Sequence, residues 1–138
     1  MILLDTNVLS EIMRAAAEPR VLRWLSAQPG TSLYTTAISE AEVLAGLAAL
    51  PKGKRRSALE TAASGLFADF HARILPFDSA AARQFPMIAT ARRRAGRPIA
   101  FADAQIASIA RAAGATVATR DGGGFADCGI VVVDPWLA

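Results

Sequence analysis

The sequence predicts an α/β protein in which a parallel sheet of about five strands lies between two layers of helices, forming a three-layer sandwich. Short apolar runs rich in β-forming residues alternate with longer segments in which apolar residues recur every three or four positions. This alternation continues along nearly the whole chain, and no repeat, linker or low-complexity segment interrupts it. We therefore expect residues 1–138 to form a single domain.

The N-terminal part should contain one strand and two helices. Met1–Leu4 is an apolar run that leads into Asp5, a residue suited to cap the helix that follows. The apolar side chains of that helix share one face: Val8, Leu9, Ile12 and Met13. Pro19 suits the first turn of a second helix, which Pro29 and Gly30 end.

The central part should contain a strand followed by two long helices. Ser32–Ile38 is rich in β-forming residues and is expected to be the second strand. Ser39–Glu42 has a capping-box pattern, which predicts a helix that continues through Leu50. After a loop at Pro51–Lys54, the next helix is expected over Ser57–Ala72.

The C-terminal part should complete the sheet. Ile74–Phe77 predicts a short strand, and the helix expected over Ser79–Ala95 contains Pro86, which should kink or split it. A further helix is expected over Ala102–Ala113, with a glycine directly after it. The last two strands are expected at Ala115–Thr119 and Ile130–Val133.

The composition excludes several classes of protein. With 53% hydrophobic and 20% charged residues the chain should fold, yet its apolar runs are far shorter than the ~20 residues that cross a bilayer. The N-terminus lacks the basic and apolar regions of a secretory signal, so we expect a cytoplasmic protein. Cys128 is the only cysteine, so any metal would be held by oxygen ligands or by His71.

The net charge of +3 is compatible with a nucleic-acid partner without requiring one. Thirteen of the 15 basic residues are arginine, whose planar guanidinium suits phosphate. Two basic clusters are candidates to contact RNA phosphates, although such runs are often only solvated helix faces and loops. They are Arg92, Arg93, Arg94 and Arg97, and Lys52, Lys54, Arg55 and Arg56.

Four acidic residues are expected at one edge of the sheet. Asp5 directly follows the first strand, and Asp121 comes just after the strand that ends at Thr119. Glu42 lies one turn into a helix that follows a strand, and Asp103 opens another helix. Ligands of open α/β sheets bind beyond the carboxyl ends of the strands, so these four side chains can converge there.

Four converging carboxylates repel one another and stay ionised only when a cation neutralises them. Oxygen ligands alone favour Mg²⁺ or Mn²⁺ over zinc. Mg²⁺ usually keeps several waters, which leaves room for a phosphate oxygen and an attacking water. The pattern therefore indicates hydrolysis of a phosphodiester bond.

Each acid alone also has a purely local explanation, as a helix cap, a capping-box partner, a dipole contact or a turn residue. These explanations do not predict that all four reach the same edge. Thr6, Asn7 and Thr119 either orient the acids or satisfy nearby backbone. Three further residues have structural interpretations: His71 as a surface or capping residue, and Trp24 and Trp136 as packing residues.

The same segments resemble the motifs of the PIN-domain family. The stretch Ile2–Asn7 is similar to the family's N-terminal signature, and Glu42–Gly46 is similar to its second motif. Ile99–Ala107 resembles the third motif, and Thr119–Asp121 resembles the fourth. The match runs from Met1 to about Pro135 in the family's order and looks closest to the VapC toxins, particularly their FitB-like branch.

This resemblance implies a PIN-like fold and a Mg²⁺-dependent endoribonuclease that acts as the toxin of a toxin–antitoxin pair. It also implies a homodimer and a cognate VapB-type antitoxin whose C-terminal segment lies across the active site. Four residues match the family's metal ligands: Asp5, Glu42, Asp103 and Asp121. The chain departs from many relatives at Gly122–Phe125, where they carry a further acid, and Asp127 is out of register with that position.

Competing functions differ in how well they fit. Gly53-Lys54 lacks the earlier glycine of a phosphate-binding loop and follows a helix, and no lysine lies at a late strand end as a phospho-accepting receiver requires. A catalytically silent module that binds a nucleic acid or a protein remains an alternative. A metal-dependent DNA nuclease also remains open, because nothing in the sequence visibly recognises a 2′-hydroxyl.

Overall fold

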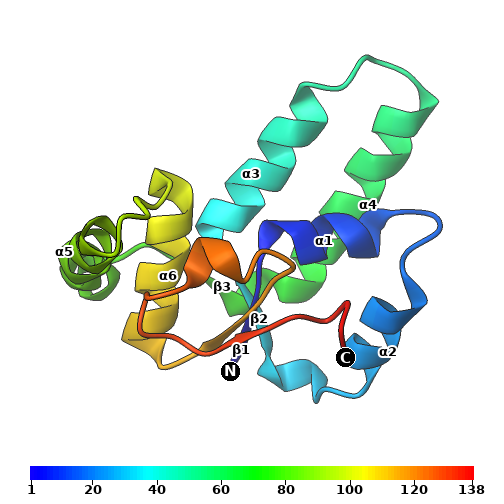
Figure 1. Cartoon of the computed structure of the whole chain (residues 1–138). Helices are drawn as coiled ribbons and strands as arrows, with labels where there is room; N and C mark the ends of the chain where they lie inside the picture. The colour runs from blue at the N-terminus through cyan, green and yellow to red at the C-terminus, as the bar shows by residue number, and fades with distance from the viewer.

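The computed structural model describes residues 1–138. Five parallel strands form the central sheet of the protein (Figure 1). The order across the sheet is β3-β2-β1-β4-β5. The strands are β1 (Ile2–Leu4), β2 (Leu33–Thr36), β3 (Ile74–Leu75), β4 (Thr116–Ala118) and β5 (Val132–Val133). They are shorter than the sequence indicates, but all five expected strands are present and parallel.

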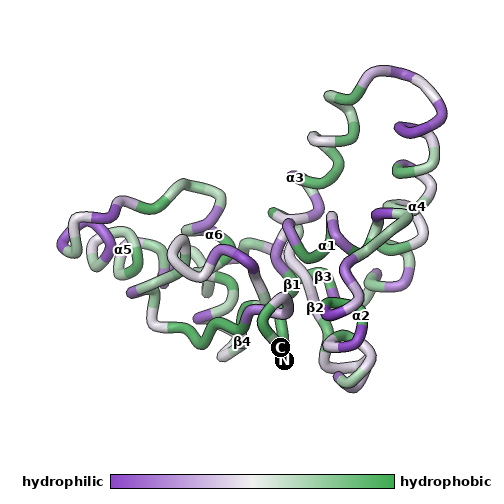
Figure 2. The backbone as a smooth tube through the Cα atoms, turned by 45° about the vertical axis from the view of Figure 1, so that its right-hand side comes forward, coloured by the Kyte–Doolittle hydropathy of each residue, from purple (hydrophilic) through white to green (hydrophobic).

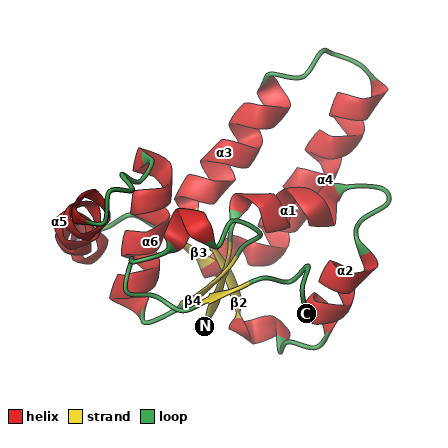
Figure 3. Cartoon of the chain, viewed as in Figure 1, coloured by secondary structure: helices red, strands yellow, loops and turns green.

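Six α-helices and three 3-10 turns connect the strands (Figure 3). The α-helices are α1 (Thr6–Met13), α2 (Pro19–Ser26), α3 (Ala37–Ala48), α4 (Lys54–Phe70), α5 (Ser79–Arg94) and α6 (Phe101–Ala113). The 3-10 turns are η1 (Gly30–Ser32), η2 (His71–Arg73) and η3 (Gly123–Phe125). No helix combines the length and the apolar character that crossing a bilayer requires.

The helices cover the sheet from two sides, which confirms the predicted three-layer architecture. Leu3 of β1 packs in a core with residues of α5 and α6, such as Ile88 and Ile106. The next residue, Leu4, packs in a second core with Val8 and other residues of α1, α3 and α4. In Figure 2 the central strands are mainly hydrophobic, whereas the turn between α3 and α4 is hydrophilic. Each fully buried aliphatic side chain contributes about 1.5–3 kcal/mol to folding.

The position of β1 determines where a ligand can bind. The chain adds β2 and β3 on one side of β1 and β4 and β5 on the other, so the connections diverge between β1 and β4. The residue pairs across this junction include Leu4 opposite Ala118, and the Asp5 amide donates to the Ala118 carbonyl at 3.0 Å. Such a divergence at the carboxyl ends of parallel strands leaves a crevice for a ligand.

The start of α3 differs from the capping box expected at Ser39. The helix begins at Ala37, and its cap is Thr36, whose Oγ1 accepts from the Ser39 amide at 3.1 Å. Thr36 ends the strand and can cap the helix at once, so no separate capping segment is needed. Ser39 is fully buried inside the helix, and Glu42 is consequently not a capping residue.

Other boundaries also differ from expectation. Helix α5 continues through Pro86, so of the two expected effects, a kink or a split, the split does not occur. The packing of α5 against α6 compensates for the backbone bond that proline removes. Helix α4 begins at Lys54, three residues before the expected start at Ser57, so Lys54, Arg55 and Arg56 lie in its first turn. His71 caps the end of α4 and is exposed, as predicted.

Candidate functional site

Asp5 lies at the base of the candidate site. It directly follows β1 and caps α1, where Oδ1 accepts from the Thr6 amide at 2.8 Å. Its other oxygen, Oδ2, accepts from the Thr119 hydroxyl at 2.7 Å. The residue is only 6% exposed. Capping is therefore a real role of Asp5, but one oxygen is held by a residue 114 positions away, which a purely local explanation does not predict.

Thr119 connects the two neighbouring strand ends. Besides donating to Asp5, its fully buried hydroxyl accepts from the Asn7 amide group and from the Asp121 backbone amide, both at 3.0 Å. The side-chain oxygen of Asn7, Oδ1, accepts from the Arg120 backbone amide at 3.2 Å. Asn7 and Thr119 thus accept hydrogen bonds from backbone amides, and Thr119 also orients Asp5. Both roles expected from the sequence, local backbone bonding and orientation of an acid, are therefore present.

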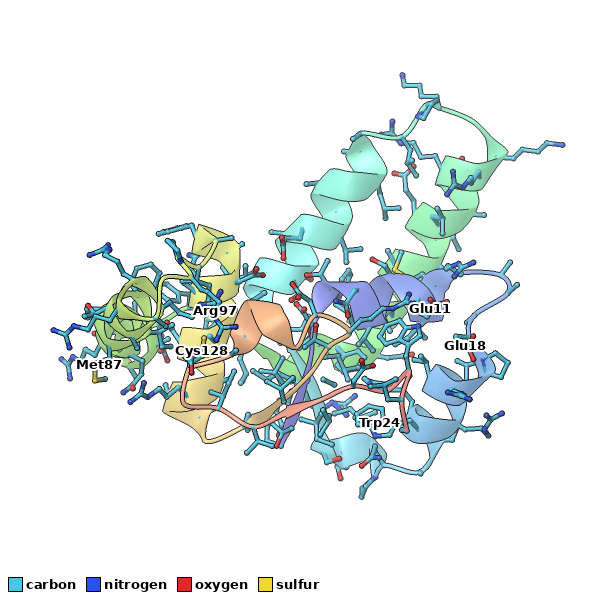
Figure 4. All side chains as sticks on the ribbon, in the orientation of Figure 1. Glu11, Glu18, Trp24, Met87, Arg97 and Cys128 are labelled. Carbon is cyan, nitrogen blue, oxygen red and sulfur yellow. The ribbon has the colours of Figure 1, made fainter.

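The other three acids reach the site from separate elements. The Thr6 hydroxyl donates to Glu42 Oε1 at 2.8 Å, and this bond connects α1 to α3. Asp121 Oδ1 accepts from the Gly124 amide at 3.0 Å. Asp103 lies in the first turn of α6 and is partly buried. Figure 4 shows oxygen-bearing side chains gathered where α1, α3 and η3 meet.

The pKa values of Asp103 and Asp5 respond to the charges of neighbouring acids. Burial is the main cause that raises the pKa of Asp103 to about 6, followed by the charges of Asp5, Glu42 and Asp121, while Arg92 lowers it. Burial also raises the pKa of Asp5, against the hydrogen bonds from Thr119 and Thr6. The predicted site residues are therefore brought into one electrostatic environment from four distant segments.

The donor set fits a hard divalent cation. Every candidate ligand is a carboxylate, and their mutual repulsion is relieved by positive charge. No group of three or more acidic, histidine or cysteine side chains lies close enough to enclose an ion directly. Mg²⁺ usually needs only one or two protein carboxylates and fills its remaining positions with water, so wider spacing is compatible with it.

The first basic cluster requires a correction. Arg92 is only 5% exposed, so it is wrongly assigned as a candidate for RNA contact; its guanidinium donates to backbone carbonyls. Arg97 forms an ion pair with Asp127, so the Asp127 carboxylate has a partner other than the four candidate acids. The sequence shows three arginines in a row but not which one faces inward, because that depends on how α5 packs.

The remaining predicted surface and packing residues agree with the structure. Lys52, Lys54 and Arg55 are exposed beside the turn between α3 and α4, and Arg56 pairs with Glu60. Trp24 and Trp136 pack against the core of the α1 side, as expected. The Arg120 guanidinium also lies over the Trp136 ring, 5.1 Å from its centroid.

Comparison with known proteins identifies the family. The profile of the PIN domain matches residues 2–129. The chain belongs to the PIN-domain family. The matched range includes all four acids of the candidate site.

Two named relatives align with almost the whole chain. It is 41% identical to VapC ribonuclease Y4jK of Sinorhizobium fredii, over 99% of this chain and 98% of that protein. It is 40% identical to Toxin FitB of Neisseria gonorrhoeae, over 99% of both. The crystal structure of FitAcB from Neisseria gonorrhoeae superposes with a TM-score of 0.92 at 39% identity, covering both chains completely.

The repulsion in this PIN-domain site predicts how metal-free stability depends on pH. Because folding raises the pKa of Asp103, this residue favours the folded state below pH 4, and the contribution is lost as pH rises through about 6. In EDTA, the melting temperature of D103N should therefore fall less than that of the wild type when the pH is raised from 5 to 7.5. Differential scanning fluorimetry measures this difference.

Mg²⁺ provides the second half of the same test. At pH 7.5 it should raise the melting temperature of the wild type and raise that of D103N less, since one repelling charge is gone. The matched control is D69N, which changes an exposed aspartate on α4 and should follow the wild type. Identical pH profiles for D103N and wild type would contradict the electrostatic coupling of Asp103.

Proposed function

We propose that the protein is a Mg²⁺-dependent endoribonuclease, formed by a single PIN domain, and the toxin of a toxin–antitoxin pair. The observation that carries this proposal is that acids from distant segments share one environment. Hydrogen bonds hold Asp5 to Thr119 and Glu42 to Thr6, and the charges of Asp5, Glu42 and Asp121 raise the pKa of Asp103. The names of the relatives, a VapC ribonuclease and a toxin, give further support.

In this proposal Asp5, Glu42, Asp103 and Asp121 hold Mg²⁺, some of them through its bound waters, and Mn²⁺ can substitute for it. When bound, the ion polarises a phosphate oxygen and lowers the pKa of a water molecule. Thr119 fixes Asp5 Oδ2, and Thr6 fixes Glu42 Oε1, so these two carboxylates are oriented before RNA arrives.

Asp103 is the acid best suited to accept a proton. None of the hydrogen bonds that orient the other three acids involves it, and no hydrogen bond contributes to its pKa of about 6. An oxygen of Asp103 is therefore free to take the proton of the attacking water near neutral pH. Asp5 is less suited, because both of its oxygens already accept hydrogen bonds.

We place the antitoxin segment in the groove beside Glu42. This groove of about 670 Å³ lies between α1, α3 and α4, and its walls are largely apolar, with Val43 and Leu47 among them. Arg14 and Arg55 also line it, so an apolar segment with an acidic residue would fit. The proposed assembly is a homodimer that binds a VapB-type antitoxin in the cytoplasm.

The D5N variant tests the metal assignment directly. Replacing a ligand oxygen by an uncharged amide should lower Mg²⁺-dependent cleavage of RNA at least about 100-fold, more than losing an outer-shell partner. The fold should survive, because one charge is removed from a repelling set. The measurement is cleavage of total cellular RNA, and a single-stranded DNA arm distinguishes a DNA nuclease.

D69N serves again as the exposed control and should cleave RNA at the wild-type rate. Wild-type cleavage by D5N in Mg²⁺ would show that the assigned site is wrong. A wild-type protein that binds RNA but cuts neither substrate would favour the silent binding module instead.

The T119V variant tests the orientation of the acids. Valine matches the shape of threonine but removes the bonds to Asp5, Asn7 and Asp121, so cleavage should fall about 10–100-fold. The buried unpaired groups should also cost about 1–3 kcal/mol of unfolding free energy. T119S keeps the hydroxyl and should restore cleavage; equal loss in both variants would mean that packing, not the hydroxyl, matters.

Expression in bacteria tests the toxin assignment. Production of the protein without its antitoxin should arrest growth, because an endoribonuclease that is not inhibited destroys cellular RNA. Production of D5N at the same level should permit growth. Colony counts after induction measure the effect, and normal growth with high levels of active wild-type protein would contradict a toxin.

A further inference from the structure

The buried guanidinium of Arg92 has a connection to the site that the proposed function does not use. Arg92 lies in the last turn of α5, and its Nη1 donates to the carbonyl oxygens of Gly124 at 2.8 Å and Ala126 at 3.0 Å. A longer contact of 3.2 Å reaches Gly123. Its Nε donates to the Arg97 carbonyl at 2.6 Å. One side chain thus ties the end of α5 to the segment that follows Asp121.

A buried arginine without an acidic partner is costly unless its donors are satisfied. No carboxylate forms an ion pair with Arg92, and its hydrogen bonds go to main-chain oxygens instead. The planar, forked guanidinium can reach several carbonyls in fixed directions, which the single ammonium group of lysine cannot. This arrangement fixes the conformation of the backbone from Gly123 to Ala126.

The fixed segment in turn holds Asp121. The Gly124 backbone amide donates to Asp121 Oδ1. The backbone carbonyl of the same glycine is the nearest acceptor for Arg92 in this segment. A Cβ atom at Gly124 would collide with the Asp121 carboxylate, whereas one at Gly123 would meet open space. The position of this carboxylate therefore depends on how closely the Gly124 backbone approaches it.

The charge of Arg92 also reaches the site. It lowers the pKa of Asp103, against the effects of burial and of the other three acids. The guanidinium therefore supports both the position of one acid and the ionised form of another. Figure 4 shows the neighbouring residues Arg97 and Cys128 beside η3, on the side away from α2.

We infer that Arg92 is a positioning residue, which holds the Gly123–Ala126 segment so that Asp121 is oriented toward the metal. This inference rests on the proposed function, because it assigns Asp121 to the Mg²⁺ site. Arg92 itself is buried away from substrate and acts through the Gly124 backbone and the Asp121 carboxylate.

The first experiment measures Mg²⁺ binding without RNA. In fluorimetric melts at pH 7.5, R92M should need at least about tenfold more Mg²⁺ than the wild type for half of the maximal thermal shift. The control R83M removes an exposed arginine from the same helix and should match the wild type. A lower melting temperature for R92M with an unchanged Mg²⁺ midpoint would mean a merely structural role and would overturn the inference.

A matched glycine pair tests the step from backbone to acid with Arg92 intact. G124A should raise the Mg²⁺ midpoint about as much as R92M, because its methyl group displaces Asp121. G123A makes the same chemical change one residue earlier, in open space, and should leave the midpoint unchanged. Equal midpoints for G124A and G123A would overturn the proposed path, and this pair remains informative if R92M does not fold.

Hydrogen exchange of the metal-free protein tests the first step. The Gly124 amide, which is bonded to Asp121, should exchange faster in R92M than in R83M. Unchanged exchange would overturn the inference, since Arg92 would then not hold the segment. A wild type without any Mg²⁺-dependent shift would overturn the proposed metal site together with this inference. A wild type that shows the Mg²⁺-dependent shift, together with an R92M variant that has the same Mg²⁺ midpoint, would overturn only the role of Arg92.

Discussion

The parallel pairing of β1 with β4 is the constraint on which the rest of the structure depends. It places Leu4 opposite Ala118, so the next residues of each strand, Asp5 and Thr119, meet at the sheet edge. More than 110 residues separate the two strands in the sequence, and the intervening chain supplies both helical layers. If the register shifted by one residue, side chains of the core and of the opposite face would exchange places, and the site would be lost with the core.

The two cores provide the free energy that holds repelling acids together. Leu3 and Leu4 point to opposite sides of β1 and are both fully buried, so the strand that presents Asp5 is fixed from two directions. The site itself opposes folding, since burial and neighbouring charges raise the pKa of Asp5 and Asp103. Such a local conflict within an otherwise consistent fold is typical of a functional site, where chemistry and not stability determines the residues.

Much of this arrangement follows from sequence because strand ends are visible in it. An apolar run that stops at Asp5, and another that ends just before Asp121, already define one edge of a parallel sheet. The start of α3 was less accessible, since Thr36 and Ser39 are both good caps and only the length of β2 decides between them. The inward orientation of Arg92 was not accessible either, because tertiary packing selects which face of α5 is covered.

The glycine-rich segment after Asp121 brings its backbone into contact with an acid on one side and an arginine on the other. In this segment the backbone lies close to both Asp121 and Arg92. A side chain at Gly124 would displace the Asp121 carboxylate. The loop carbonyls also bind the buried Arg92 guanidinium, whose positive charge lowers the pKa of Asp103. A further carboxylate in this loop would add repulsion to a group already partly neutralised at pH 6. Here backbone oxygens bind an arginine inside the fold, and under the proposed function the four acids alone face the cation.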